Sequence, residues 1–292
     1  MKILYVAEFY RIDFQCDMIF HGLRSLLGED CVDSNEAWLM YEGFRQKWAR
    51  RIPERIMDNG RDFTLYGLLP FVEIDRTDLE SKIRNHYFDK IVYGSHTRCM
   101  DYFNVVRRYY NIPDIIFING EDDQNINQDL AIYPYFKREL NFSIHPNVKP
   151  INFCIPKERI VKTVPNKTQD WATIIPGDRS TYKFSDEESY FNDYQKSYFG
   201  VTTKKGGWDC LRHYEILMNG CIPFFPDLEY CPQQTMTQFP KKLVMEATNK
   251  IKNEEDLSFY DEYVISLLEW TNNHLTTEEV AKNIIENEWS KK

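Results

Sequence analysis

The chain has 292 residues and a formal net charge of −9, and 42% of its residues are hydrophobic. A chain of this length can bury a sizeable core, in one large or two modest domains. The acidic balance argues against a protein coated with basic surface for nucleic acid, although a local basic patch remains compatible with it. The abundant aromatic residues, 19 Tyr, 19 Phe and 6 Trp, suit stacking on sugars or bases and suit an aromatic core equally well.

Seven cysteines are scattered along the chain, none of them forms a C-x-x-C pair, and their number is odd. This pattern is typical of a reduced, intracellular protein rather than of a disulfide scaffold or a zinc module. No apolar run approaches the ~20 residues of a membrane helix, and the apolar N-terminus reaches Glu8 too early for a signal peptide. We therefore expect a cytoplasmic protein without a membrane span.

The first half of the chain alternates apolar runs with amphipathic segments. Continuous apolar runs predict strands that are buried on both faces, and the amphipathic segments predict helices. This alternation is typical of an α/β unit with a parallel sheet. In chain order we expect strands at 3–7, 91–93 and 115–118, and helices at 14–27, 78–86 and 97–110.

The second half repeats the alternation after a stretch, 140–150, that has two prolines and little periodicity. We place a domain boundary in this stretch and expect domains at 1–145 and 146–292. A capping sequence at 276–279 marks the start of the last helix, which can pack back on the first domain. We expect strands at 172–175, 199–202, 221–225 and 242–245, and helices at 190–196, about 208–219, 254–272 and 276–289.

Polar residues follow several of the predicted strands. Glu8 follows the first strand, His96 follows the second, and the acidic run Glu121-Asp122-Asp123 follows the third. In parallel sheets, ligands bind beyond the carboxyl ends of the strands. We therefore expect these side chains to meet around one crevice.

The stretch 204–225, KKGGWDCLRHYEILMNGCIPFF, predicts a Gly-rich loop, a helix that begins near Trp208 or Asp209, and a buried strand. The paired lysines bring positive charge to the loop, and the paired glycines let a ligand approach the backbone closely. The free N–H groups and the positive dipole end of the helix suit a phosphate. Arg212 and Glu215, three residues apart, share one helix face.

In segment 197–225 the chain resembles glycosyltransferases of the two-Rossmann-domain class (GT-B), and in particular the exostosin-like pattern. In that pattern a strand leads to a Gly-containing loop, then to Arg-x-x-Glu on a helix, and then to Gly-Cys-Ile-Pro and a strand. Here these elements are 199–201, 206–207, Arg212 with Glu215, and 220–223. The family's usual Cys-x-x-Pro-Gly opening is replaced by Thr-Lys-Lys-Gly-Gly.

The resemblance implies an α/β fold with two Rossmann-like domains that face each other across a cleft. It implies transfer of a sugar from a UDP- or GDP-linked donor to a hydroxyl acceptor, a glycan, with inversion and without a required cofactor. The small size resembles viral or phage enzymes, and a viral protein would act in the host cytoplasm. By position, Glu215 would bind hydroxyls of the donor, and basic residues would hold its diphosphate. The expected donor-binding residues are Arg179, Lys204, Lys205, Gly206, Gly207, Asp209, Arg212 and Glu215.

Such a transfer makes three demands on the residues. The leaving diphosphate needs cations or oriented N–H groups, the acceptor hydroxyl needs a general base if the reaction inverts, and a closing cleft can hold the donor in line. For the base we rank Asp122 or Asp123 first, because clustered like charges raise one pKa, then Glu8 and then His96. Each of these alone is more often a cap, a solvated turn or a structural histidine.

Three alternatives stay open. The acidic run also resembles the metal-binding motif of single-domain, manganese-dependent (GT-A) glycosyltransferases, in which Glu121 and Asp123 could hold Mn²⁺ or Mg²⁺ against a diphosphate. The basic stretch 45–55, with Trp48, could recognise an anionic acceptor such as a nucleic acid, although a solvated helix face is the favoured interpretation. A two-lobed protein could also bind a nucleotide or a sugar without catalysis.

Overall fold

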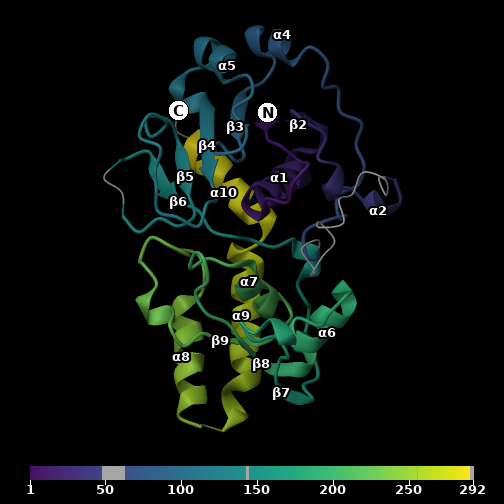
Figure 1. Ribbon diagram of the computed structural model, residues 1–292, viewed down its shortest axis with the longest axis vertical. Helices are drawn as coiled ribbons and strands as arrows, with labels where there is room; N and C mark the ends of the chain where they lie inside the picture. Colours follow the sequence, from purple (N-terminus) through teal and green to yellow (C-terminus); the bar gives the residue numbers. More distant parts are fainter. Residues whose placement is uncertain (48–62, 143–144, 255, 290–292) are drawn as a thin grey trace.

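The structure, a computed structural model, describes residues 1–47, 63–142, 145–254 and 256–289. Two parallel sheets organise these residues, the larger one near the top of Figure 1 and the smaller one in its lower half. The predicted α/β class with parallel strands is thereby confirmed.

The larger sheet has the strand order β2-β1-β3-β4-β5-β6. The chain therefore reverses direction across the sheet between β1 and β3, which makes this point a topological switch. The predicted strands at 3–7, 91–93 and 115–118 are confirmed, because their apolar runs are buried on both faces. The strands are β1 (Ile3–Val6), β2 (Cys31–Asp33), β3 (Lys90–Tyr93), β4 (Ile115–Asn119), β5 (Tyr135–Lys137) and β6 (Val148–Pro150).

Helices α1 (Phe14–Leu27), α2 (Phe44–Lys47), α4 (Leu79–Arg84) and α5 (Phe103–Tyr109) accompany the larger sheet. The predicted helix at 14–27 is confirmed, and the Asp13 carboxylate caps it by accepting from the Cys16 N–H. The helix expected at 97–110 begins only at Phe103. Its first turns are absent because Tyr102 has a left-handed backbone with φ 62°, which a helix cannot contain.

The smaller sheet consists of β7 (Gln169–Trp171), β8 (Ser197–Val201) and β9 (Ile222–Phe224). The strand expected at 172–175 is wrong in position, since β7 ends at Trp171. The Asp193 carboxylate accepts from the Thr173 N–H and hydroxyl at 2.7 and 2.8 Å. These bonds satisfy Thr173 outside the sheet ladder, so the chain leaves the sheet there.

Four helices, α6 (Glu187–Lys196), α7 (Leu211–Met218), α8 (Lys241–Lys252) and α9 (Tyr260–His274), belong to the same half of Figure 1 as the smaller sheet. The strand expected at 242–245 is wrong, because this segment lies within α8. A short apolar run cannot be told from a buried helix segment by periodicity. Here Val244, Ala247 and Thr248 are the buried residues, at helical spacing.

The last helix, α10 (Thr277–Trp289), returns to the larger sheet and packs against α1 (Figure 1). Its predicted cap is present, because the Thr276 hydroxyl accepts from the Glu279 N–H at 3.2 Å. The two helices approach so closely that a Cβ added to Gly22 would lie 2.0 Å from the Thr277 carbonyl oxygen. Among the described residues, no helix is long and apolar enough to cross a membrane.

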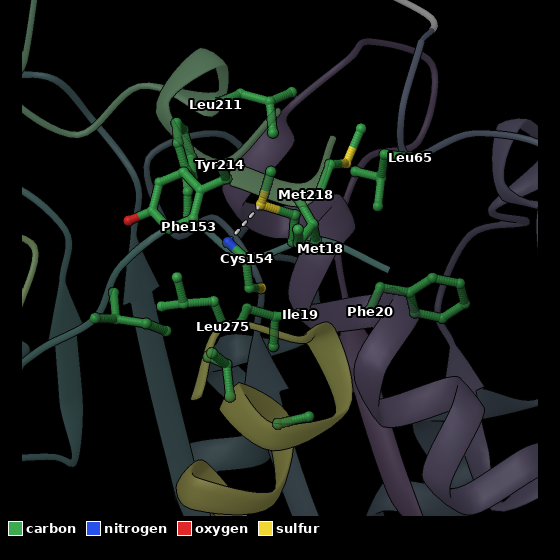
Figure 2. Close-up of a cluster of buried hydrophobic side chains, with 14 of the residues drawn as sticks. Met18, Ile19, Phe20, Leu65, Phe153, Cys154, Leu211, Tyr214, Met218 and Leu275 are labelled. Carbon is green, nitrogen blue, oxygen red and sulfur yellow. Dashed lines mark hydrogen bonds between the residues drawn. The ribbon is translucent and has the colours of Figure 1, made fainter. Parts of the chain in front are cut away.

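We call the larger sheet with α1, α2, α4, α5 and α10 the large-sheet lobe, and the smaller sheet with α6–α9 the small-sheet lobe. One apolar core runs through both lobes. Figure 2 shows Met18 and Ile19 of α1 beside Cys154, in the connection between the sheets, and Tyr214 and Met218 of α7. The Cys154 N–H donates to the Met18 sulfur at 3.3 Å. This shared core fixes where α7 and the loop before it lie relative to the larger sheet.

Candidate functional site

Two cavities adjoin each other next to the N-terminal end of α7. The first, which we call the cationic cavity, has a volume of about 1090 Å³, and the second, the aromatic cavity, has about 190 Å³. Phe14, Tyr182 and Arg212 line both cavities, and Phe14 reaches them from α1 of the large-sheet lobe. The other residues of the cationic cavity are Pro176, Gly177, Arg179, Thr203, Lys204 and Lys205; those of the aromatic cavity are Phe63, Ile174, Phe184, Tyr190, Cys210, Leu211 and Glu215.

Four of the expected donor-binding cations therefore lie around one cavity: Arg179, Lys204, Lys205 and Arg212. The hydroxyl of Tyr182 accepts from Lys205 Nζ at 3.0 Å and from Arg212 Nη1 at 3.2 Å. Burial raises the pKa of Tyr182, but the two neighbouring cations outweigh burial and lower it below its ordinary value. Arg212 Nε is buried and has no hydrogen-bond partner among the described residues. Lys204 Nζ donates to the carbonyls of Lys205 and Gly206 at 3.2 and 3.5 Å. The cavity thus concentrates positive charge, and the hydrogen bonds of Lys204, Lys205 and Arg212 in it go to neutral oxygens.

The paired glycines have a different role from the expected one. A Cβ added to Gly206 would lie 2.4 Å from Asp122 Oδ2, and a Cβ on Gly207 would lie 2.4 Å from Glu139 Oε1. Glu139 accepts from the N–H groups of Trp208 and Asp209 at 3.0 and 2.8 Å. The glycines therefore admit two carboxylates of the large-sheet lobe rather than a ligand, and these N–H groups bond to the protein itself.

Asp209 was expected on the donor side, and the structure buries it elsewhere. Its carboxylate accepts from the Phe153 N–H and from the Tyr214 hydroxyl, each at 2.7 Å. Burial raises the pKa of Asp209 to about 6, against the attraction of the Arg138 guanidinium. Asp209 lines neither cavity and instead fastens the loop to the connection between the sheets. The helix itself begins at Leu211, later than predicted.

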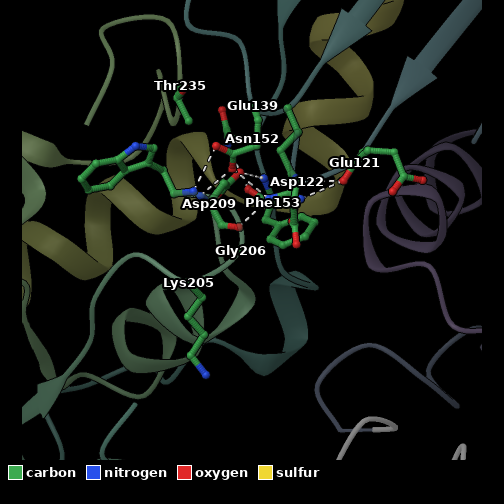
Figure 3. A network of polar contacts seen from close by, with 12 residues as sticks. Glu121, Asp122, Glu139, Asn152, Phe153, Lys205, Gly206, Asp209 and Thr235 are labelled. Atoms are coloured by element: carbon green, nitrogen blue, oxygen red, sulfur yellow. Dashed lines mark hydrogen bonds and ion pairs between the residues drawn. The ribbon is translucent and has the colours of Figure 1, made fainter. Parts of the chain in front are cut away.

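Arg138, which directly follows β5, joins the two lobes and was not singled out in the sequence. Its guanidinium is buried, pairs with Glu139 at 3.0 Å and with Asp122, and donates to the Gly120 carbonyl. It also donates to the Asp209 carbonyl. Figure 3 shows Lys205 pointing away from Glu139, Asp122 and Asp209. Its Nζ donates to the Tyr182 hydroxyl instead. The sequence clue was a run of three charged residues at 137–139, the first of which is the last residue of β5.

The loop 202–210 between β8 and α7 carries Lys204 and Lys205, and we call it the cationic loop. His213 stabilises this loop and was likewise not singled out in the sequence. Its Nε2–H donates to the Trp208 carbonyl at 2.8 Å, which fixes the tautomer, and its Nδ1 accepts from the Thr202 hydroxyl at 2.7 Å. Burial lowers the pKa of His213 to about 4. Asp227 holds the same loop from the other side, because it accepts from the Thr203 hydroxyl at 2.8 Å. These bonds position the two lysines at the cavity wall.

The carboxylates of the acidic run after β4 diverge toward different partners. Asp122 pairs with Arg138, and its side chain is 64% exposed. Asp123 accepts from the Asn125 N–H at 2.7 Å, a bond that lowers its pKa. Glu121 accepts from the Thr97 hydroxyl at 2.9 Å. Within the described ranges, no group of three or more His, Cys, Asp or Glu side chains could hold a metal ion.

The remaining base candidates line neither cavity. His96 is buried, its Nε2 lies 2.7 Å from the Tyr135 hydroxyl, and burial lowers its pKa to about 4. The imidazole is therefore neutral near pH 7 and packs as a structural residue. Glu8 is half-buried and contacts Tyr10. Asp122 lies against the loop that carries Lys204 and Lys205, because a Cβ added to Gly206 would lie 2.4 Å from its Oδ2.

Glu215 lies in the aromatic cavity and is 7% exposed. Its Oε1 accepts from the Thr64 hydroxyl at 2.6 Å, and its Oε2 accepts from the Tyr190 hydroxyl at 2.5 Å. Burial raises the pKa of Glu215, while the two hydroxyls and the Arg212 guanidinium oppose that change. The site thus combines four cations, several aromatic walls and one buried carboxyl group.

Most of the basic stretch 45–55 that was considered for an anionic acceptor, including Trp48, lies outside the described residues. A scan of the sequence against protein-family models gave no match, and a search of curated proteins gave no significant match.

Proposed function

We propose that this protein is a glycosyltransferase that moves a sugar from a UDP- or GDP-linked donor to a hydroxyl group of a glycan acceptor, with inversion. In this proposal the chain has the two-domain GT-B arrangement, with an acceptor-side domain at 1–145 and a donor-side domain at 146–292, from which β6 and α10 pack with the larger sheet. The observation that carries the proposal is the convergence of four cations on one cavity that adjoins an aromatic cavity with a buried carboxyl group.

The cationic cavity suits the diphosphate of the donor. Transfer leaves negative charge on the departing diphosphate, and preorganised cations stabilise that charge most where water is excluded. The bonds from Lys205 and Arg212 to the neutral Tyr182 hydroxyl can be exchanged for stronger charge-assisted bonds to phosphate oxygens. Because Glu139 already occupies the N–H groups of Trp208 and Asp209, the side chains supply this stabilisation and need no metal.

The aromatic cavity suits the nucleoside. Rings such as Tyr182 and Phe184 can cover the face of a planar base. Each oxygen of the Glu215 carboxylate accepts one hydroxyl bond, from Thr64 or from Tyr190. The remaining lone pairs of these oxygens can accept from ribose hydroxyls. A nucleoside diphosphate can therefore bind across both cavities, with Arg212 in contact with each part.

The acceptor side is proposed to carry the general base, and Asp122 is the first candidate. It lies against Gly206 of the loop whose lysines line the cationic cavity, and its side chain is mostly exposed. An acceptor hydroxyl that enters beside this loop could transfer its proton to Asp122. Asp123, Glu8 and His96 are the lower-ranked candidates.

The test measures the binding of UDP and GDP by calorimetry, first to the wild-type protein and then to Arg212→Ala. The variant loses a charge-assisted contact of about 1.5–3 kcal/mol, so we expect about 10- to 100-fold weaker binding. Arg108→Ala, which removes an exposed arginine on α5, is the control and should bind like the wild type. Wild-type affinity in Arg212→Ala would show that the diphosphate does not bind there.

One observation favours a second candidate, a protein that binds a nucleotide sugar without catalysis. None of the candidate bases lines either cavity. Slow hydrolysis of a nucleotide sugar in the absence of an acceptor separates the two functions, since a pure binding protein releases no free sugar. The same assay with a chelating agent tests the metal-dependent alternative, which predicts that the chelating agent abolishes the hydrolysis.

A further inference from the structure

Thr64 lies in the segment between α2 and α4, and its polar groups all bond to residues later in the chain than β6. It is fully buried, and five residues further on Leu69 forms a bridge with Tyr41 of the large-sheet lobe. The Thr64 N–H donates to Glu187 Oε1 at 2.6 Å, and its carbonyl accepts from Arg159 Nε at 3.2 Å. Its hydroxyl donates to Glu215 Oε1 at 2.6 Å. One residue of the first half thus reaches the proposed donor site.

The backbone of Thr64 is strained. Its φ is 75°, in the left-handed region that β-branched residues avoid. Strained residues persist where the surroundings determine them several times over, and they concentrate at functional sites. Arg159 and Glu187, which both bond to the Thr64 backbone, also form an ion pair of 2.9 Å with each other. The strain is therefore maintained by the same contacts that deliver the hydroxyl to Glu215.

Glu215 depends on few donors for its orientation. Its side chain is buried, and the hydroxyls of Thr64 and Tyr190 each bond one of its two oxygens. Without the first bond, the Oε1 atom would be buried without its donor and the carboxyl group could rotate. Phe63, next to Thr64, packs its ring on Tyr190 with centroids 5.7 Å apart, so the same short segment supports both donors.

We propose that Thr64 is a positioning residue that holds the Glu215 carboxylate in the orientation that receives the donor's hydroxyl groups. This role rests on the proposed function, because it assumes that Glu215 contacts the donor. It also links distant parts of the chain, since a residue that precedes α4 bonds to Glu187, Glu215 and Arg159, all of which follow β6.

The charge of Glu215 provides a readout that a purely structural role would not change. The groups that face it are the hydroxyls of Thr64, Tyr190 and Tyr194, the thiol of Cys210, the guanidinium of Arg212 and the carboxylate of Glu187. Burial raises the pKa of Glu215, and the Thr64 hydroxyl lowers it. Removal of that hydroxyl therefore raises the pKa further, and the ionised, ligand-accepting form is lost at a higher pH.

The experiment measures the dissociation constants of UDP and GDP between pH 5 and pH 8. Thr64→Val should bind about tenfold more weakly at pH 7, the effect of about 1.4 kcal/mol, and the acid limb of its profile should move to higher pH. Thr64→Ser keeps the hydroxyl and should restore the wild-type profile. Thr271→Val is the matched control, because Thr271 is equally buried but its hydroxyl bonds only within its own helix.

If Thr64→Val does not fold, Thr64→Gly replaces it, since glycine adopts the left-handed backbone without strain. A wild-type pH profile in the variant that lacks the hydroxyl, with intact affinity, would overturn the role of Thr64 alone. If the wild-type protein binds neither nucleotide, the proposed function and the role of Thr64 both fail.

Discussion

At the scale of single residues, burial sets the charge of acidic side chains. Asp17 of α1 is the clearest case, because burial, reinforced by the nearby Asp13 carboxylate, raises its pKa to about 8. Its Oδ2 accepts from the Tyr66 hydroxyl at 2.6 Å and from the Asp13 N–H at 3.0 Å. Its Oδ1 is buried without a hydrogen-bond partner among the described residues. Near neutral pH this carboxyl group is largely protonated in the folded protein.

The raised pKa of Asp17 predicts a loss of stability at higher pH. The folded state binds this proton more tightly than the unfolded state, so its contribution is fully present below about pH 4 and is lost as pH rises through about 8. Asp17→Asn resembles the protonated form and should flatten the dependence of the melting temperature on pH across this range. Asp101→Asn, at an exposed position, should leave the slope unchanged. An equally steep slope in Asp17→Asn would contradict the assignment.

At the scale of elements, the contact between α1 and α10 depends on a glycine. α10 is the last helix, yet it lies beside the first, and Gly22 meets the backbone of Thr277 where α10 begins. This contact brings the end of the chain onto the lobe formed by its beginning. It also stabilises α1, whose first residue, Phe14, lines both cavities. A displacement of α10 should therefore shift Phe14 and change the shape of both cavities.

Gly22→Ala tests this packing. Alanine favours the helix by about 1 kcal/mol relative to glycine, but its Cβ would lie 2.0 Å from a carbonyl oxygen and would force the helices apart. We expect a net destabilisation of about 1–3 kcal/mol in urea unfolding, the usual cost of overpacking. Ser25→Ala, on the exposed face of α1, is the control and should be nearly neutral. A stabilised Gly22→Ala would show that the helices separate easily.

At the scale of the whole molecule, the lobes are joined by a shared apolar core and by the buried Arg138. The guanidinium pairs with Glu139 and Asp122 and donates to the carbonyl of Asp209. Glu139 in turn holds the backbone of the loop before α7. The position of the cationic loop relative to the larger sheet therefore depends on one buried charge network.

Arg138→Met should destabilise the protein strongly. It leaves Glu139 buried without its cation, and breaking a buried pair on one side costs about 3–5 kcal/mol. The double variant Arg138→Met/Glu139→Gln removes both charges and should recover part of that loss in denaturant unfolding. If both variants were equally destabilised, the loss would come from packing, from the carbonyl contacts, or from the backbone N–H group that loses its acceptor when Glu139 becomes Gln, rather than from an unpaired carboxylate.

Much of the fold was predictable, and the reason is local. Strands β1, β3 and β4 are continuous apolar runs, and α1 has a cap and an amphipathic pattern. The errors came from segments whose pattern is ambiguous or overridden. The run at 242–245 is too short to distinguish a strand from a helix. Strand β7 ends before the predicted segment 172–175, because the Asp193 carboxylate accepts from the Thr173 N–H outside the sheet.

For the candidate site, the cations were predictable because charge and glycine spacing are visible in the sequence. Arg179 and the two loop lysines do lie around one cavity with Arg212. The missed residues act across long separations. Thr64 lies 151 residues from Glu215, and Glu139 lies 70 residues from Asp209. A single sequence contains no local pattern that pairs such residues.

The sequence by itself determined the parallel α/β architecture and the loop-helix-strand unit that carries the positive charge, because apolar runs and residue spacing act over short distances. Only the tertiary structure decided what the N–H groups of Trp208 and Asp209 bind. They face Glu139 rather than open solvent, because β5 places that carboxylate against Gly207. A backbone donor bonds to whichever acceptor the fold brings close, and that acceptor is set by packing between distant segments.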